Sequence, residues 1–97
     1  MGARKSPHSA GEPPSREELE AQLPSSPRWW SNGPGDTYGK HSHTQHKVLF
    51  CQEGSIVFHT DEGDIELEAG DRLDLDPGTD HAATVGPRGV VCVEAYR

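Results

Sequence analysis

Residues 35–54 read GDTYGKHSHTQHKVLFCQEG, and residues 70–85 read GDRLDLDPGTDHAATV. The first stretch contains His41 and His43, whose i, i+2 spacing places both side chains on one face of a β-strand. Two imidazoles on one face can bind a single metal ion. The alternative interpretation of residues 41–46 is a polar surface loop with adventitious metal affinity.

Turn residues divide the sequence around these two stretches into short segments. Clusters of turn-forming residues occur at 32–35, 61–64, 69–71, 77–78 and 86–87. Between them we predict strands over 47–59, 65–68, 72–75, 81–85 and 90–96. Turns at such regular spacing are typical of an antiparallel all-β domain, which we expect to occupy residues 28–97. The run 48–51, Val-Leu-Phe-Cys, is apolar on both faces, which indicates a central strand covered by the core on one side and by a second subunit or the N-terminal helix on the other.

The N-terminal residues 1–27 differ from the rest of the chain. Residues 1–14 have no apolar periodicity and contain three prolines, so we expect a disordered tail. Ser15 and Glu18 have the spacing of a capping box, and Leu19 and Leu23 then fall on one helical face. We therefore predict one short helix near residues 15–23.

The chain of 97 residues is 31% hydrophobic and has a formal net charge of −7. Such a chain builds one modest core, and a domain of this size is only marginally stable alone, so we expect a homodimer. The negative charge repels phosphate backbones and anionic bilayers, and no apolar stretch reaches the length of a membrane span. We therefore expect a soluble, cytoplasmic protein with no nucleic-acid or membrane partner.

The two cysteines, Cys51 and Cys92, lie far apart in the sequence within apolar runs. They lack the close spacing of a zinc knuckle or a redox couple. We predict that both are buried, reduced core residues. The alternative, a disulfide between them, requires an oxidising compartment.

The two histidine-containing stretches together resemble the two motifs of the cupin family. The first reads Gly35, five residues, His41-x-His43, three residues, Lys47, six residues, Gly54, and the second reads Gly70, five residues, Asp76-x-Gly78, two residues, His81, three residues, Val85. The resemblance extends over about residues 29–97 and implies an antiparallel double-stranded β-helix, the jelly-roll barrel of cupins. It also implies that His41, His43 and His81 bind a divalent transition metal, either Fe, Mn, Ni or Zn.

Lys47 departs from the first motif because it stands where cupins have a glutamate ligand. In the second motif, Asp76 and Val85 replace proline and asparagine. An ammonium about 5 Å from a divalent ion, at an effective dielectric constant of ~20, would cost about 6 to 7 kcal/mol. Three arrangements avoid this conflict: a Lys47 that is displaced or turned outward, which we favour; a Lys47 deprotonated by burial and the field of the metal; and a metal-free site in which Lys47 binds an anionic ligand.

Three further side chains are candidates for the site. His46 is an additional metal ligand only if a bulge resets the strand, because the register that points Lys47 inward points His46 outward. Glu94 interrupts an apolar run, and we favour solvent exposure at an edge over a general acid or base in the cavity. Tyr38, close before the histidines, and Lys47 are the other catalytic candidates.

The cupin resemblance leaves two classes of function open. One is a metal-dependent oxygenase, isomerase or lyase that acts on a small molecule, and the other is a non-catalytic binding or sensory module for a small ligand, with or without a metal. Trp29 and Trp30, at the barrel entry, are interpreted as a packing lid or dimer contact. An apolar cavity is predicted from the side chains expected to point inward, which are Leu49, Cys51, Leu73, Leu75 and Ala83.

Overall fold

The computed structural model describes residues 2–9 and 11–97 of the protein. The elements in chain order are β1 (Ala3–Ser6), α1 (Arg16–Ala21), β2 (Arg28–Asn32), β3 (Thr37–His41), β4 (Lys47–Thr60), β5 (Gly63–Glu68), β6 (Arg72–Leu75) and β7 (His81–Tyr96). All strand pairs are antiparallel. The described part of the chain contains no helix long and apolar enough to cross a membrane.

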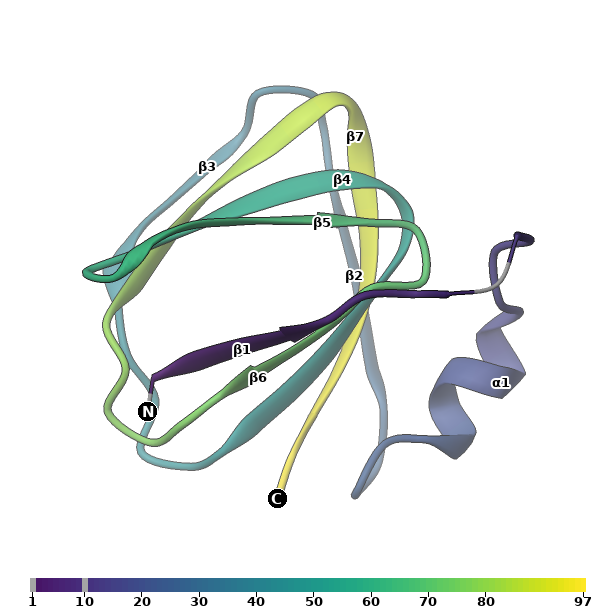
Figure 1. Ribbon diagram of the computed structural model, residues 1–97, viewed down its shortest axis with the longest axis horizontal. Helices are drawn as coiled ribbons and strands as arrows, with labels where there is room; N and C mark the ends of the chain where they lie inside the picture. Colours follow the sequence, from purple (N-terminus) through teal and green to yellow (C-terminus); the bar gives the residue numbers. More distant parts are fainter. Residues whose placement is uncertain (1, 10) are drawn as a thin grey trace.

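Two long strands, β4 and β7, pair with each other along most of their length and take part in both layers of the barrel. The first half of β4 also pairs with β6, and the second half also pairs with β5. One layer therefore has the order β1-β6-β4-β7-β2, and the other contains β5, β4, β7 and β3. In Figure 1, β7 rises along one side, bends over at the top and descends towards the C-terminus. The predicted double-stranded β-helix is confirmed.

The bends in β4 and β7 coincide with glycines. Gly54 has a φ of +73°, and a Cβ at this position would overlap the carbonyl oxygen of Gly89 on the neighbouring strand. The register between β4 and β7 shifts on either side of Gly54. The prediction of a turn at residues 86–87 was wrong, because these residues lie within the continuous strand β7, where they accompany a bend and not a chain reversal.

The N-terminal segment is ordered against the barrel where we expected a disordered tail. Strand β1 pairs with β6, whose backbone edge would otherwise be free. Asp76, which replaces the proline of the second motif, accepts a hydrogen bond from the Gly2 N–H at 2.9 Å. Asp71 accepts one from the His8 N–H at 2.8 Å. Two carboxylates thus fix a segment that has too little apolar surface to fold alone.

Helix α1 covers the outer face of the β4–β7 pair (Figure 1). Ser15 and Glu18 form the predicted capping box. Leu19 is 1% exposed and packs in a cluster with Val48 and Phe50 of β4, and with Val93 of β7. Of the two covers proposed for the apolar run 48–51, the structure shows the N-terminal helix.

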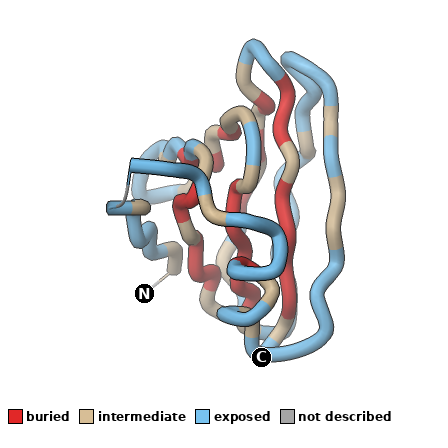
Figure 2. The backbone as a smooth tube through the Cα atoms, turned by 90° about the vertical axis from the view of Figure 1, so that its right-hand side faces the viewer, coloured by how far each residue is buried: buried red, intermediate tan, exposed pale blue. Residues whose placement is uncertain are grey.

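The main core fills the space between the two layers, and its buried residues follow neighbouring strands (Figure 2). Cys51 and Cys92 lie opposite each other in β4 and β7, and both are buried and free. The residues predicted to point inward all belong to this core: Leu49, Cys51, Leu73, Leu75 and Ala83. The prediction that they line a cavity holds only for Ala83, because the other four fill the packed core.

Candidate functional site

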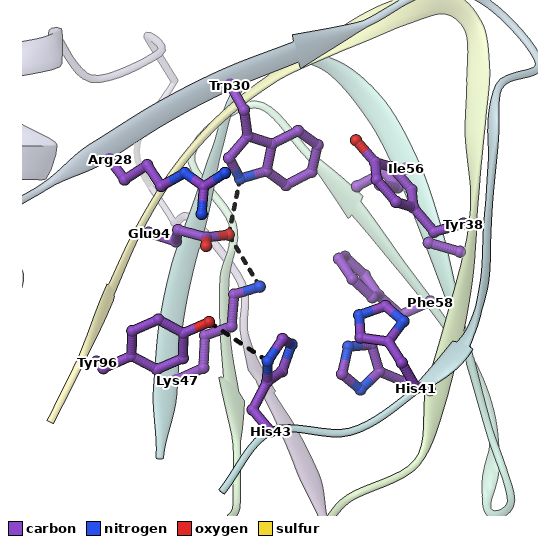
Figure 3. Close-up of a pocket in the computed structure, with 12 residues that line it drawn as sticks. Arg28, Trp30, Tyr38, His41, His43, Lys47, Ile56, Phe58, Glu94 and Tyr96 are labelled. Atoms are coloured by element: carbon purple, nitrogen blue, oxygen red, sulfur yellow. Dashed lines mark hydrogen bonds and ion pairs between the residues drawn. The ribbon is translucent and has the colours of Figure 1, made fainter. Parts of the chain in front are cut away.

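A cavity of about 210 Å³ opens at one end of the barrel, next to the core. Three histidines, His41, His43 and His81, line one part of it. The rest of its wall combines aromatic and aliphatic side chains with two buried charged residues, Lys47 and Glu94 (Figure 3). The cavity therefore brings together the three predicted metal ligands and every predicted catalytic candidate.

The three histidines come together because β3 pairs with the start of β7. His41 ends β3 and lies opposite His81, with ring centroids 4.4 Å apart. His43 lies two residues beyond the strand, and its carbonyl accepts a hydrogen bond from the Gly78 N–H at 2.8 Å. One ring nitrogen from each of the three histidines lies within 4.8 Å of those of the other two. His41 is exposed, His43 half-buried and His81 buried, so this triad extends from the surface inward.

Hydrogen bonds fix the tautomers of two of these rings. The Nδ1 of His41 is 2.7 Å from the Gly39 carbonyl oxygen, and the Nδ1 of His81 is 3.0 Å from that of Thr79. Since a carbonyl only accepts, each Nδ1 carries a proton, and in the neutral ring the Nε2 then has a free lone pair. Such support of the distal nitrogen is typical of metal-binding histidines.

The third ring, His43, has a different partner. Its Nδ1 is 3.3 Å from the hydroxyl of Tyr96. Its Nε2 is buried and has no hydrogen-bond partner among the described residues. A buried nitrogen without a partner is costly, and a metal ion that joins the other two rings would satisfy it. The donor set of three imidazoles fits a divalent transition metal.

The protonation states of two rings of the triad, His43 and His81, also fit a metal. Burial, reinforced by the positive charge of Lys47, lowers the pKa of His43 below its ordinary value of 6.5. Burial also lowers the pKa of His81, although its hydrogen bond to Thr79 acts in the opposite direction. Both rings are therefore neutral at pH 7, as metal ligation requires.

Lys47 and Glu94 form an ion pair inside the cavity, with 2.9 Å between Nζ and Oε1 (Figure 3). The indole Nε1 of Trp30 donates to the same carboxylate oxygen at 2.8 Å. The expected exposure of Glu94 was wrong, because only 5% of the residue is exposed. Lys47 does not turn outward either, and its ammonium is held by Glu94. Each charge offsets the cost of burying the other.

Residues 28–93 match the Cupin domain family, Cupin_2. The chain belongs to the cupin family. No curated protein matches the sequence. Among solved structures, an RmlC-like cupin from Shewanella frigidimarina NCIMB 400 is similar at 24% identity and a TM-score of 0.66, with 73% of this chain and 63% of that chain covered.

Two further solved structures resemble this cupin. A DUF861 family protein from Thermotoga maritima shares 16% identity with a TM-score of 0.65, over 98% of this chain and 99% of that chain. A chain from the structures of the DMSP lyases RdDddP and RnDddQII shares 27% identity with a TM-score of 0.67, over 77% of this chain but only 40% of that chain. The likenesses below 25% identity show the fold alone.

His46 lies outside the triad of this cupin. Its Nε2 is 3.0 Å from Asp74 Oδ1, and its Nδ1 is 3.6 Å from Asp76 Oδ1. Arg72 also binds the Asp74 carboxylate, at 2.9 Å. The structure does not bring His46 to the other histidines, in agreement with the register that points it away from Lys47.

Two aromatic residues form one wall of the cavity. The Tyr38 ring stands edge-on to that of Trp30, with centroids 5.6 Å apart. The Tyr38 hydroxyl is hydrogen-bonded to Asn32, and burial raises the pKa of Tyr38, so the phenol stays protonated. Trp30 is thus part of the cavity, whereas Trp29 packs with the outer cluster under α1.

The sequence analysis missed two polar residues that line the cavity, Arg28 and Tyr96, and two apolar ones, Ile56 and Phe58. A signal for Tyr96 existed, because it is two positions after Glu94 and shares its face of the strand. Arg28 lies opposite Glu94 in the pairing of β2 with β7. Nothing in the sequence indicates this pairing.

Proposed function

We propose that this cupin binds a divalent transition metal through His41, His43 and His81 and takes a small molecule into the adjacent cavity. The observation that carries the proposal is the buried Nε2 of His43, which lacks a partner among the described residues and lies within a cluster of three ring nitrogens. A metal held by three protein ligands keeps coordination positions open and supplies Lewis-acid or redox chemistry there.

We further propose that the reaction is that of a metal-dependent oxygenase, isomerase or lyase. The similarity to a chain from the DMSP lyase structures supports the lyase among these classes. The residues placed to hold or move a proton are Lys47 and Glu94, whose charged atoms are 2.9 Å apart in the cavity. The Tyr38 phenol also reaches the cavity, but its hydroxyl is bonded to Asn32.

A second candidate function is a metal-free, non-catalytic binding or sensory module. The observation in its favour is Lys47, which stands where the cupin motif has a carboxylate ligand and carries a charge that repels a metal ion. Glu94 offsets this repulsion, because it holds the ammonium at 2.9 Å. We therefore place the metal-binding function first.

Metal content decides between the two functions. We expect about one equivalent of metal in protein purified without an affinity tag, measured by elemental mass spectrometry, since one triad offers one site. A variant with His41→Ala, His43→Ala and His81→Ala should lose the metal. The matched control is His59→Ala, because His59 binds Asp64 and Thr84 away from the cavity. A metal-free wild type that also fails to take up zinc would contradict the proposal.

Two other expectations stay predictions. The small size of the domain favours a homodimer. The composition of the chain favours a cytoplasmic location.

A further inference from the structure

Two cationic side chains line the cavity, Lys47 and Arg28, and some of their N–H groups have no partner among the described residues. Lys47 has three N–H donors, and its ammonium makes one ion pair, with Glu94. Arg28 reaches the cavity from β2 and lies near Glu94 in Figure 3. Among the described residues, no carboxylate forms an ion pair with its guanidinium.

One oxygen of the single carboxylate that lines the cavity already has two partners. Glu94 Oε1 accepts hydrogen bonds from the Trp30 indole at 2.8 Å and from Lys47 at 2.9 Å. Two full positive charges therefore face one neutralised negative charge, before any metal adds its own. This local excess is opposite in sign to the net charge of the chain, which is −7, and Arg28 contributes to it from an exposed position that also lines the cavity.

The remaining wall of the cavity is apolar. Three residues of the buried core also line the cavity, namely Ile56, Phe58 and Ala83. Their side chains contribute only apolar surface to its wall. The ring of Trp30 extends this wall towards Arg28 (Figure 3). A volume of about 210 Å³ lies below the roughly 300 to 1,000 Å³ of pockets for drug-sized ligands, so the ligand is small.

We propose that the cavity binds a small carboxylic acid as its anion, with the carboxylate at Arg28 and Lys47 and a short apolar body against Trp30 and Phe58. Arg28 suits a carboxylate because its planar guanidinium can donate two parallel hydrogen bonds. The inference rests on the proposed function in one respect, which is that the same cavity is the ligand site. It names the class of ligand that the cavity selects.

The two tryptophans supply a built-in readout with an internal control. The Trp30 indole N–H bonds Glu94 in the cavity, whereas that of Trp29 bonds Glu20 on the outer side, at 2.6 Å. In a ¹H–¹⁵N correlation spectrum, titration with butyrate should shift the Trp30 indole signal and leave that of Trp29 unchanged. Butyramide, which has the same shape without the charge, should bind at least about tenfold more weakly. Inorganic phosphate, which lacks the apolar body, should also bind more weakly.

Variants assign the binding to the two cations. Arg28→Gln should weaken butyrate binding by about tenfold, because it removes a charge-assisted pair. The matched control is Arg88→Gln, which removes the same charge from an exposed site outside the cavity and should leave the affinity unchanged. Lys47→Met alone leaves Glu94 buried without its partner, so the double variant Lys47→Met/Glu94→Gln is used, and it should also weaken butyrate binding.

Each titration is run on metal-stripped and on zinc-loaded protein, with the zinc content measured. Equal binding of butyrate and butyramide, or of butyrate and phosphate, would overturn the inference even if zinc binds. Equal butyrate affinity in Arg28→Gln and wild type would do the same. Selective butyrate binding by a protein that takes up no zinc would support the inference and remove the metal from the proposed function.

Discussion

Where the β4–β7 strand pair borders the cavity, its inner and outer faces differ in the opposite sense from a typical surface sheet, whereas further along, the same inner face carries the apolar core. The inner face presents Lys47 and Glu94 to the cavity, whereas the outer face presents Val48, Phe50 and Val93 to helix α1. Charges are inside because each has a partner on the neighbouring strand. Apolar residues are outside because a helix covers them. Burial in this domain therefore depends on what lies opposite each side chain as much as on its polarity.

The ion pair on the inner face is weak evidence for stability. Replacing a buried pair by apolar residues is often neutral or stabilising, while removing one partner is strongly destabilising. Lys47 and Glu94 are therefore better explained by the chemistry of the cavity than by folding. Substitutions on the inner face and on the outer face can measure separately how much each set of side chains contributes to stability.

The largest effect is expected from Lys47→Met. The substitution leaves the Glu94 carboxylate buried with only the Trp30 indole as partner, and we expect the free energy of unfolding to fall by about 3 to 5 kcal/mol. Urea denaturation measures the change. The double variant Lys47→Met/Glu94→Gln should recover most of the loss. A double variant as unstable as the single one would show that the pair is not coupled.

The outer face should respond less, to Leu19→Ala. Leu19 is 1% exposed between α1 and β4, and we expect a loss of about 2 to 3 kcal/mol, since the surface helix can relax into part of the void. Urea denaturation again measures it, and zinc content should not change. Leu23→Ala, at a partly buried position of the same cluster, is the matched control with a smaller loss. A loss for Leu19→Ala below about 0.5 kcal/mol would mean that the helix does not cover the sheet in solution.

The fold could be predicted from the sequence because its signals are local. Turn residues, alternation and the two glycine–histidine stretches together specify an antiparallel barrel, and the i, i+2 pair His41 and His43 meets His81 as expected. The outward position of His46 followed from strand register. The strand register depends on neighbours in the chain, which the sequence displays directly, whereas the meeting of His81 with the other two histidines was implied by the resemblance to the two cupin motifs.

Apart from the turn expected at residues 86–87, the errors concern partners that are remote in the sequence. Glu94 was expected at the surface because an unpaired acid is costly to bury, and nothing in the sequence shows that Lys47 and Trp30 reach it. The N-terminal strand was missed for the same reason. Residues 3–6 carry no apolar pattern, and they are ordered by the free edge of β6 and by two aspartates far along the chain.

The smallest change in stability, and the finest test of the inner face, is expected from Tyr96→Phe. The Tyr96 hydroxyl is the partner of His43 Nδ1 at 3.3 Å, so its loss should cost less than about 1 kcal/mol of unfolding free energy. Zinc affinity should nevertheless fall by about tenfold, because this hydroxyl is the hydrogen-bond partner that orients the His43 ring.

Histidine ¹⁵N chemical shifts would show the cause of that weaker zinc binding. The tautomer ratio of His43 should change in Tyr96→Phe, because its Nδ1 loses the hydroxyl partner, while those of His41 and His81 should not, because their Nδ1 protons bond backbone carbonyls that the substitution leaves in place. An unchanged His43 signal with weaker zinc binding would mean that Tyr96 acts on the metal site by some other route.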